Sequence, residues 1–380
     1  MSAKPIMVLS SDWHLSPQSW KKHPRIVKDS YYSLSQIVDI ALSLNVPLIG
    51  AGDLFDVKTP PSESVLACYR EMSRLEKANL PVYYVQGQHE FSDDPWMGLC
   101  KNAVDIDSFK KNSDDPEIFE INGISICGMD ICQSPLNFGI KLGKLIEKAN
   151  NSKFDLFVTH QVWGDFIKKS EEPYLLKNAT FANMVYTGDF HKDLILDING
   201  VTCVSSGSIN MQANNENPNK RVFILNDDMS LSSYWLKTRP FVSLEIKTEK
   251  DFEFVMDSEK EALLTSWWYL NDLPEYISTP LIVVKYQNTI SNAFFALKDK
   301  FKEWNNEINP VDFSSVEITA AVERREIRDL VDIGDCISKC VPSNGITYSD
   351  AIRVFNSSDV ETEIKSMREE HLKKGVSNVS

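Results

Sequence analysis

The stretch PIMVLSSDWHL, residues 5–15, joins a short apolar run to the polar residues Asp12 and His14. The run Ile6–Ser10 is typical of a buried strand, and side chains two positions apart in extended chain point to the same side. Asp12 and His14 can therefore reach the same ion. Alone, this D-x-H pattern is weak evidence, because many surface loops contain it by chance.

Four later segments repeat the arrangement, with polar side chains directly after an apolar run. They are GAGDLFD with Asp53, GQHE with Gln88 and His89, VTHQ with His160, and YTGDFH with Asp189 and His191. Loops that follow neighbouring parallel strands meet at one edge of a sheet, so distant residues can converge there. Carboxylate, amide and imidazole groups are ligands for divalent metal ions.

The distribution of histidines strengthens this interpretation. The chain has six histidines, and four of them, His14, His89, His160 and His191, lie in these loops. Each one taken singly is most simply a polar residue near a strand end. Four histidines and three aspartates in five successive strand-end loops are hard to ascribe to chance, so the sequence predicts a centre for two metal ions.

The pattern of apolar residues predicts an α/β fold. Expected strands end at each motif, and expected helices at residues 30–44 and 62–78 separate the first three motifs. Asn-Gly pairs at 122–123 and 199–200 stand between alternating apolar residues, which is the strongest short-range signal for a β-hairpin. We therefore expect two packed mixed β-sheets flanked by helices.

The character of the chain changes near residue 237, which suggests three parts. Residues 1–236 carry the motifs and form the first predicted domain. Residues 237–320 have the pattern of a smaller α+β domain, with a helix expected at 258–270. Residues 321–380 are charged and have a helical pattern.

Composition limits the classes of function. The chain has 380 residues, a formal net charge of −14 and seven scattered cysteines, an odd number that argues against a disulfide framework. No run approaches the ~20 apolar residues that span a bilayer, so we expect a soluble cytoplasmic protein without a membrane segment. An acidic chain has little general attraction to DNA, and would need a local basic surface or a partner to bind it.

In order and spacing, the motifs resemble those of the calcineurin-like metallophosphoesterases over about residues 6–210. Within that superfamily, the chain looks most like the SbcD-type DNA repair exonucleases, through SSDWHL, GDLFDVKTPPSE and VSSGSINMQANNENPNKRVFIL. The resemblance implies a four-layer fold with residues 237–320 as a DNA-binding capping domain. It also implies that residues 321–380 dock on an ATPase subunit, and it suggests a phage or bacterial origin.

The resemblance also implies roles for the motif residues. One metal would be held by Asp12, His14, Asp53 and His191, and the other by Asp53, Gln88, His160 and Asp189. His89 would protonate the leaving oxygen or donate a hydrogen bond in the transition state, and support of Asp53 is its alternative role.

The chain departs from the family at two positions. Gln88 stands where an Asn is usual, and Asp189 stands where a His is usual. Both still offer an oxygen, so the second site is richer in oxygen and suits Mn²⁺, or else Mg²⁺, over Zn²⁺.

The function implied is a metal-dependent DNA exonuclease with some endonuclease activity, acting in repair and recombination. The chain has no G-x-x-x-x-G-K-[ST] motif, so an SMC-like coiled-coil ATPase of the SbcC type is expected as partner, with a homodimer of the nuclease. The basic residues Lys21, Lys22, Arg25 and Lys28 could contact DNA, or could simply form a solvated face.

Two alternatives stay open. The chain could be a metallophosphodiesterase that acts on small molecules, or a scaffold subunit of the same complex that has lost turnover through Gln88 and Asp189.

Overall fold

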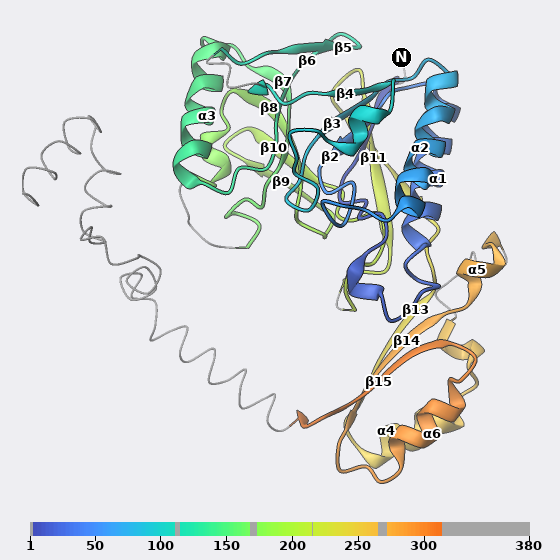
Figure 1. Cartoon of the computed structure of the whole chain (residues 1–380). Helices are drawn as coiled ribbons and strands as arrows, with labels where there is room; N and C mark the ends of the chain where they lie inside the picture. The colour runs from blue at the N-terminus through green and yellow to red at the C-terminus, as the bar shows by residue number, and fades with distance from the viewer. Residues whose placement is uncertain (1–2, 111–114, 168–172, 215, 265–271, 314–380) are drawn as a thin grey trace, which may run out of the picture. The chain divides into compact units, whose positions relative to one another are not determined.

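The structure is a computed structural model that describes residues 3–110, 115–167, 173–214, 216–264 and 272–313. The predicted C-terminal segment 321–380 lies outside these residues. The described chain is an α/β protein with two mixed six-stranded sheets and one three-stranded sheet (Figure 1). The two large sheets belong to one compact unit. The prediction of two mixed sheets is confirmed.

The first sheet carries the first three motifs at the ends of parallel strands. Its strand order is β12 (Leu231–Leu236), β11 (Lys220–Asn226), β1 (Pro5–Ser10), β2 (Leu48–Ala51), β3 (Val82–Val85) and β4 (Ala103–Asp105). Strands β1 to β4 run parallel, whereas β11 and β12 are antiparallel additions at the edge. Helices α1 (Asp29–Leu44) and α2 (Ser62–Lys77) connect the parallel strands, as the sequence predicts.

The second sheet carries the other two motifs. Its strand order is β5 (Phe119–Ile121), β6 (Ile124–Met129), β7 (Phe154–His160), β8 (Ala182–Gly188), β10 (Val201–Ser205) and β9 (Leu194–Ile198). Both Asn-Gly pairs form the expected hairpins, joining β5 to β6 and β9 to β10. Asn122 and Asn199 have φ angles of 51° and 55° there, the left-handed conformation of such turns.

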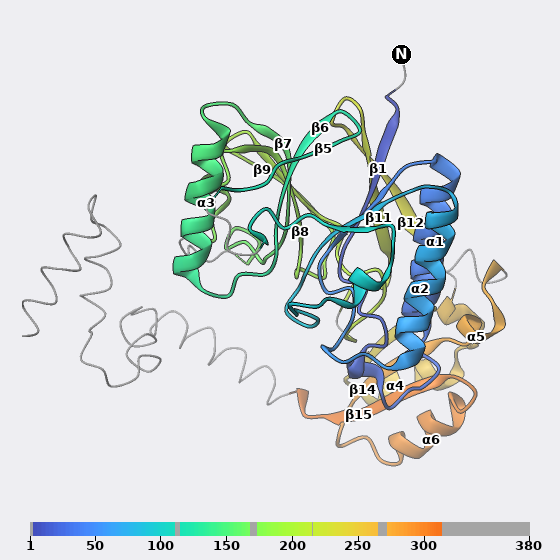
Figure 2. The ribbon, with the colours of Figure 1, turned by 45° about the horizontal axis from the view of Figure 1, so that its top comes forward.

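Three apolar clusters explain the layering of the two large sheets. One cluster lies between the sheets and includes Met7 and Ile49 from the first with Val158 and Val204 from the second. The other two clusters lie on the outer faces, against α1 and α2 on one side and against α3 (Pro135–Ala149) on the other. The order of layers is therefore helices, sheet, sheet, helix (Figure 2).

The third sheet has the order β13 (Phe241–Ile246), β14 (Leu281–Gln287) and β15 (Asn305–Val311). Its helices are α4 (Glu249–Asp257), α5 (Glu275–Ser278) and α6 (Ala293–Lys300). The helix predicted at 258–270 is only partly covered by the described chain: Glu261–Leu264 form a short 3-10 helix, and residues 265–271 lie outside the described residues. Helix α4, which the sequence pattern did not predict, begins with a capping box between Thr248 and Asp251.

Three further 3-10 helices lie in the connections, at Gln18–Trp20, Trp96–Leu99 and Leu176–Asn178. Across the described ranges, none of the helices combines the length and the apolar composition that a bilayer crossing requires.

Candidate metal centre

The five motif loops meet at one edge of the paired sheets. Three overlapping groups of side chains each place their ligand atoms within 4.8 Å of one another: Asp12, His14 and His191; His14, Asp53 and His89; and Asp12, Asp53 and His160. Six of the eight predicted site residues are therefore brought together. Asp189 belongs to none of these groups, and Gln88 contacts it from the loop after β3.

Each of the four histidines is held at Nδ1 by an oxygen that can only accept a hydrogen bond. His14 donates to Asp56 Oδ1 at 2.8 Å and His191 to Glu216 Oε1 at 2.9 Å. The other two donate to backbone carbonyl oxygens, His89 to Asp56 at 2.9 Å and His160 to Ala51 at 2.7 Å. In the neutral imidazole, the lone pair then lies on Nε2, which is the atom that can bind a metal.

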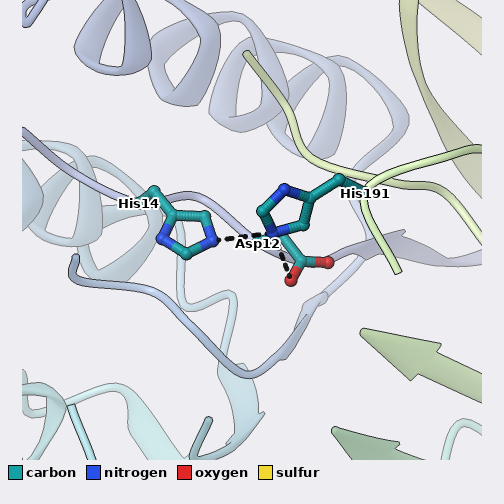
Figure 3. Close-up of side chains that lie close together, drawn as sticks. All are labelled: Asp12, His14 and His191. Carbon is teal, nitrogen blue, oxygen red and sulfur yellow. Dashed lines mark hydrogen bonds and ion pairs between the residues drawn. The ribbon is translucent and has the colours of Figure 1, made fainter. Parts of the chain in front are cut away.

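The Nε2 atoms converge on the carboxylates. His160 Nε2 lies 3.2 Å from Asp53 Oδ2, and His14 Nε2 lies 3.6 Å from the same oxygen. His191 Nε2 lies 3.8 Å from Asp12 Oδ1 and only 3.1 Å from His14 Nε2 (Figure 3). Two imidazole lone pairs at that separation repel each other unless a proton or a cation lies between them, so this geometry fits a metal ion.

Unpartnered polar atoms give a second test of the fit. Four candidate ligands have a buried side-chain atom without a hydrogen bond: Asp12 Oδ2, Asp53 Oδ2, Gln88 Oε1 and His160 Nε2. A buried polar atom without a partner is costly, and most such atoms in proteins are satisfied. Metal ions would satisfy these oxygens and this nitrogen, and the donor set of carboxylate, amide and imidazole suits divalent ions.

The electrostatics of the centre favour positive charge. Burial alone would lower the pKa of His160, but the adjacent Asp53 carboxylate raises that pKa to about 10. Burial likewise opposes the ionised form of Asp53, yet His160 and His14 hold the pKa of this carboxyl below its ordinary value. The pocket therefore favours positive charge, whether from protons or from a metal ion.

Four candidate ligands have a left-handed backbone. Asp12, His14, Asp53 and Asp189 have φ angles of 51°, 40°, 49° and 70°. This conformation is uncommon for residues other than glycine, and Asp and His are among the side chains that adopt it more often.

Two glycines make the close packing around the centre possible. Gly52 has a φ of 77°, and a Cβ atom there would collide with the imidazole of His160. A Cβ at Gly87 would collide with the Asp53 carboxylate and backbone. Glu90 holds the Gly87 turn by accepting its backbone N–H at 3.0 Å. Burial and the Asp53 charge raise the pKa of Glu90 to about 8.

Sequence reasoning missed the support of His191 by Glu216. Glu216 accepts hydrogen bonds from His191 Nδ1, from Lys220 Nζ at 2.8 Å and from Ser208 Oγ at 3.0 Å. Lys220 is only 4% exposed, so its charge is neutralised inside the protein. Asp56, at the end of the second motif, supports His14 in the same way.

The four basic residues proposed to contact DNA differ in their surroundings. Lys21, Lys22 and Arg25 are exposed. Lys28 is also exposed, but its Nζ pairs with Glu63 Oε1 at 2.7 Å.

Comparison with known proteins finds relatives of one kind. No protein-family model matches the chain. The DNA double-strand break repair protein Mre11 of Sulfurisphaera tokodaii is 36% identical over 124 residues, which are 31% of this chain and 31% of that protein. Mre11 of Methanocaldococcus jannaschii is 23% identical over 343 residues, 84% of this chain and 87% of the relative.

The extent of these matches varies between relatives. The chain spans only 21% of Mre11 from Sulfolobus acidocaldarius, at 37% identity, but 79% of Mre11 from Methanococcus maripaludis, at 24% identity. Among solved structures, a novel archaeal phosphodiesterase aligns with 60% of this chain and 99% of its own, with a TM-score of 0.34 and 11% identity.

Proposed function

We propose that this chain, a distant homologue of archaeal Mre11 proteins of the Mre11/SbcD family of metallophosphoesterases, is a two-metal nuclease acting on DNA. The observation that carries the proposal is the meeting of Asp12, Asp53 and their neighbouring histidines in overlapping groups of ligand atoms. Repair and recombination of DNA are the processes in which we expect it to act.

We propose two metal positions that share Asp53. The outer position is formed by Asp12, His14, Asp53 and His191, and the inner position by Asp53, Gln88, His160 and Asp189. The oxygen-rich inner position favours Mn²⁺ or Mg²⁺. Held by these residues, divalent ions would supply charge stabilisation for a phosphate group and activation of water.

His89 is the candidate catalytic residue among the histidines. Its side chain is 41% exposed, compared with 28% for His191, and His14 and His160 are buried, so His89 is the motif histidine most open to substrate. The bond from Nδ1 to the Asp56 carbonyl leaves Nε2 directed toward the centre, 3.7 Å from Asp53 Oδ2. The imidazolium form can therefore give its Nε2 proton to the leaving sugar oxygen, or stabilise charge in the transition state.

The rest of the chain has proposed roles in binding. We propose residues 237–320 as a capping domain that binds DNA, and residues 321–380 as the segment that docks on an SMC-like ATPase of the SbcC type. The nuclease would form a homodimer. The net charge of −14 fits this division, because a partner would supply part of the attraction to DNA phosphates. The exposed Lys21, Lys22 and Arg25 would add a local contribution.

The test is a nuclease assay on linear DNA with Mn²⁺, with and without the ATPase, for wild type and His89→Ala. Removal of a general acid is expected to lower the cleavage rate by about 100-fold or more, because such groups contribute about 10²–10⁴-fold. Binding of Mn²⁺, followed by calorimetry, should not change. His23→Ala is the matched control, because His23 pairs with Glu307 and belongs to no group of candidate ligands among the described residues.

Other outcomes of this assay favour the alternatives. Cleavage of a chromogenic phosphodiester without cleavage of DNA would indicate an enzyme for small molecules. Fewer than two Mn²⁺ per chain, together with intact DNA in the presence of the ATPase, would indicate a scaffold. If His89→Ala cleaves DNA at the wild-type rate, His89 has no part in proton transfer.

A further inference from the structure

A hydrogen bond joins the two residues of the inner position that come from different sheets. Gln88 follows β3 of the first sheet, Asp189 follows β8 of the second, and Gln88 Nε2 donates to Asp189 Oδ1 at 2.8 Å. We propose that Gln88 and Asp189 act as one coupled unit, in which the carboxylate orients the amide so that its oxygen can bind the inner metal ion. This inference rests on the proposed two-metal function.

The orientation follows from the chemistry of the amide group. A glutamine side chain has its donors on Nε2 and its acceptor on Oε1, so fixing one end also fixes the other. With Nε2 held by Asp189, Gln88 Oε1 is buried and has no hydrogen-bond partner. Asp53 Oδ2 and His160 Nε2, the other proposed ligand atoms of the inner position, are unpartnered too. A cation would satisfy all three atoms.

Asp189 is itself held firmly enough to orient a neighbour. Its backbone N–H donates to Asp12 Oδ1 at 2.9 Å, and its φ of 70° commits the loop to a left-handed turn. Its side chain steers Gln88 while its backbone steers a ligand of the outer position. Since Oδ1 takes the Gln88 amide, the other carboxylate oxygen of Asp189 is the one we assign to the ion.

The length of glutamine makes such restraint necessary. A glutamine side chain has several rotatable bonds, and ordering them has an entropic cost that a fixed hydrogen bond helps to offset. Without Asp189, the Gln88 oxygen would sample many directions and would bind an ion less well. Likewise, without Gln88 the Asp189 carboxylate would lose the amide N–H that it accepts.

A double-mutant cycle on Mn²⁺ binding tests the coupling. Calorimetry and the electron paramagnetic resonance spectrum of Mn²⁺ would be recorded for wild type, Gln88→Ala, Asp189→Ala and the double variant. Each single change is expected to weaken the second Mn²⁺ by about 10- to 100-fold, the usual effect of losing a group that supports a metal ligand. The double variant should lose less affinity than the product of the two single losses, because the single changes share the loss of one interaction.

Different results would contradict the coupling of Gln88 with Asp189 and the proposed two-metal function. If the effects of the single changes multiply in the double variant, Gln88 and Asp189 act independently and the coupling is wrong. If wild type binds fewer than two Mn²⁺, the proposed function and the coupling both fail. If wild type binds two and cuts DNA while the effects multiply, only the coupling fails.

Asp189→Asn provides a milder variant in case the alanine variants do not fold. It keeps an oxygen that can accept the Gln88 amide but removes the charge, so a smaller loss of affinity than in Asp189→Ala is expected. Equal losses in the two variants would mean that the charge alone matters, and would overturn the orienting role. Asp193→Asn is the matched control, since Asp193 lies in the same loop but pairs with Arg221 at 2.6 Å.

Discussion

The outer and inner positions of the proposed metal centre are built in different ways. At the outer position, His14 and His191 donate to the carboxylates Asp56 and Glu216, and His191 remains 28% exposed. At the inner position, His160 is completely buried and donates to a backbone carbonyl. Carboxylate partners thus orient the outer imidazoles, Asp56 from the second motif and Glu216 from outside the motifs, whereas burial and the backbone orient the inner one.

This difference indicates which of the two positions is formed before a metal ion binds. Carboxylate partners increase the basicity of an imidazole and hold it in place before any metal binds. Unpartnered buried atoms occur at both positions, but the inner one has two of its own, Gln88 Oε1 and His160 Nε2, against Asp12 Oδ2 at the outer one; Asp53 Oδ2 belongs to both. We therefore expect the outer position to be preformed, and the inner position to depend on its ion for stability.

Loss of the Asp53 carboxylate should weaken metal binding at the outer and the inner position alike, because this carboxylate belongs to both positions. In Asp53→Asn, we expect DNA cleavage to fall by about 1,000-fold or more, since metal ions contribute several kcal/mol to such reactions. Calorimetry should show weaker binding of both Mn²⁺ ions. Asp197→Asn, at an exposed position of β9, is the control with the same chemical change. Retention of one tight Mn²⁺ would mean that Asp53 does not bridge.

A change at Glu216 should affect the outer position alone. Glu216→Gln keeps an acceptor for His191 but removes the charge, so we expect about 10-fold weaker binding at the outer position, within the usual range for supporting residues. The inner affinity should be unchanged. Glu120→Gln, at an exposed position of β5, is the control. Equal weakening of Mn²⁺ binding at both positions would show that Glu216 does not act on the outer position alone.

The smallest expected effect comes from Asp130, and it changes the stability of the fold without changing either metal position. Asp130 Oδ1 accepts the backbone N–H of Gln86, near the third motif, and burial with the nearby Asp107 charge raises the pKa of Asp130 to about 8. Because the folded pKa is raised, the stability that this group contributes is present below about pH 4 and is lost as the pH rises toward 8.

Asp130→Asn removes this dependence. The free energy of unfolding should fall with rising pH more steeply in wild type than in the variant. The two slopes should differ by at most about 1.4 kcal/mol per pH unit, the energy that corresponds to one pKa unit. Urea denaturation between pH 5 and 8 measures the two slopes. Parallel curves for the two proteins would contradict the raised pKa.

The strand-end motifs could be read from the sequence because each depends on a local pattern. An apolar run predicts a strand, and parallel strands bring the residues after them to one edge. Asp12, Asp53 and His160 follow this logic, and the structure brings them together. The Asn-Gly hairpins and helices α1 and α2 were predictable for the same reason.

Other features depend on contacts that no local pattern encodes. Glu216 lies 25 residues beyond His191 in a polar loop, and only the folded chain brings the two together. Strand β15 has the sequence NNEINPV, whose polar residues and proline give no strand signal, yet it forms part of the third sheet. Helix α4 was not predicted, although it had a local signal in the capping box at Thr248 and Asp251.

The left-handed backbone at Asp12, His14, Asp53 and Asp189 has a consequence for protein engineering. A transplant of the same side chains onto regular strand ends of another scaffold would point them in other directions, because φ sets where each Cβ projects. The graft would have to include the loops, together with the glycines that pack against them. For the same reason, substitutions in these loops should be screened for backbone compatibility before side-chain chemistry is considered.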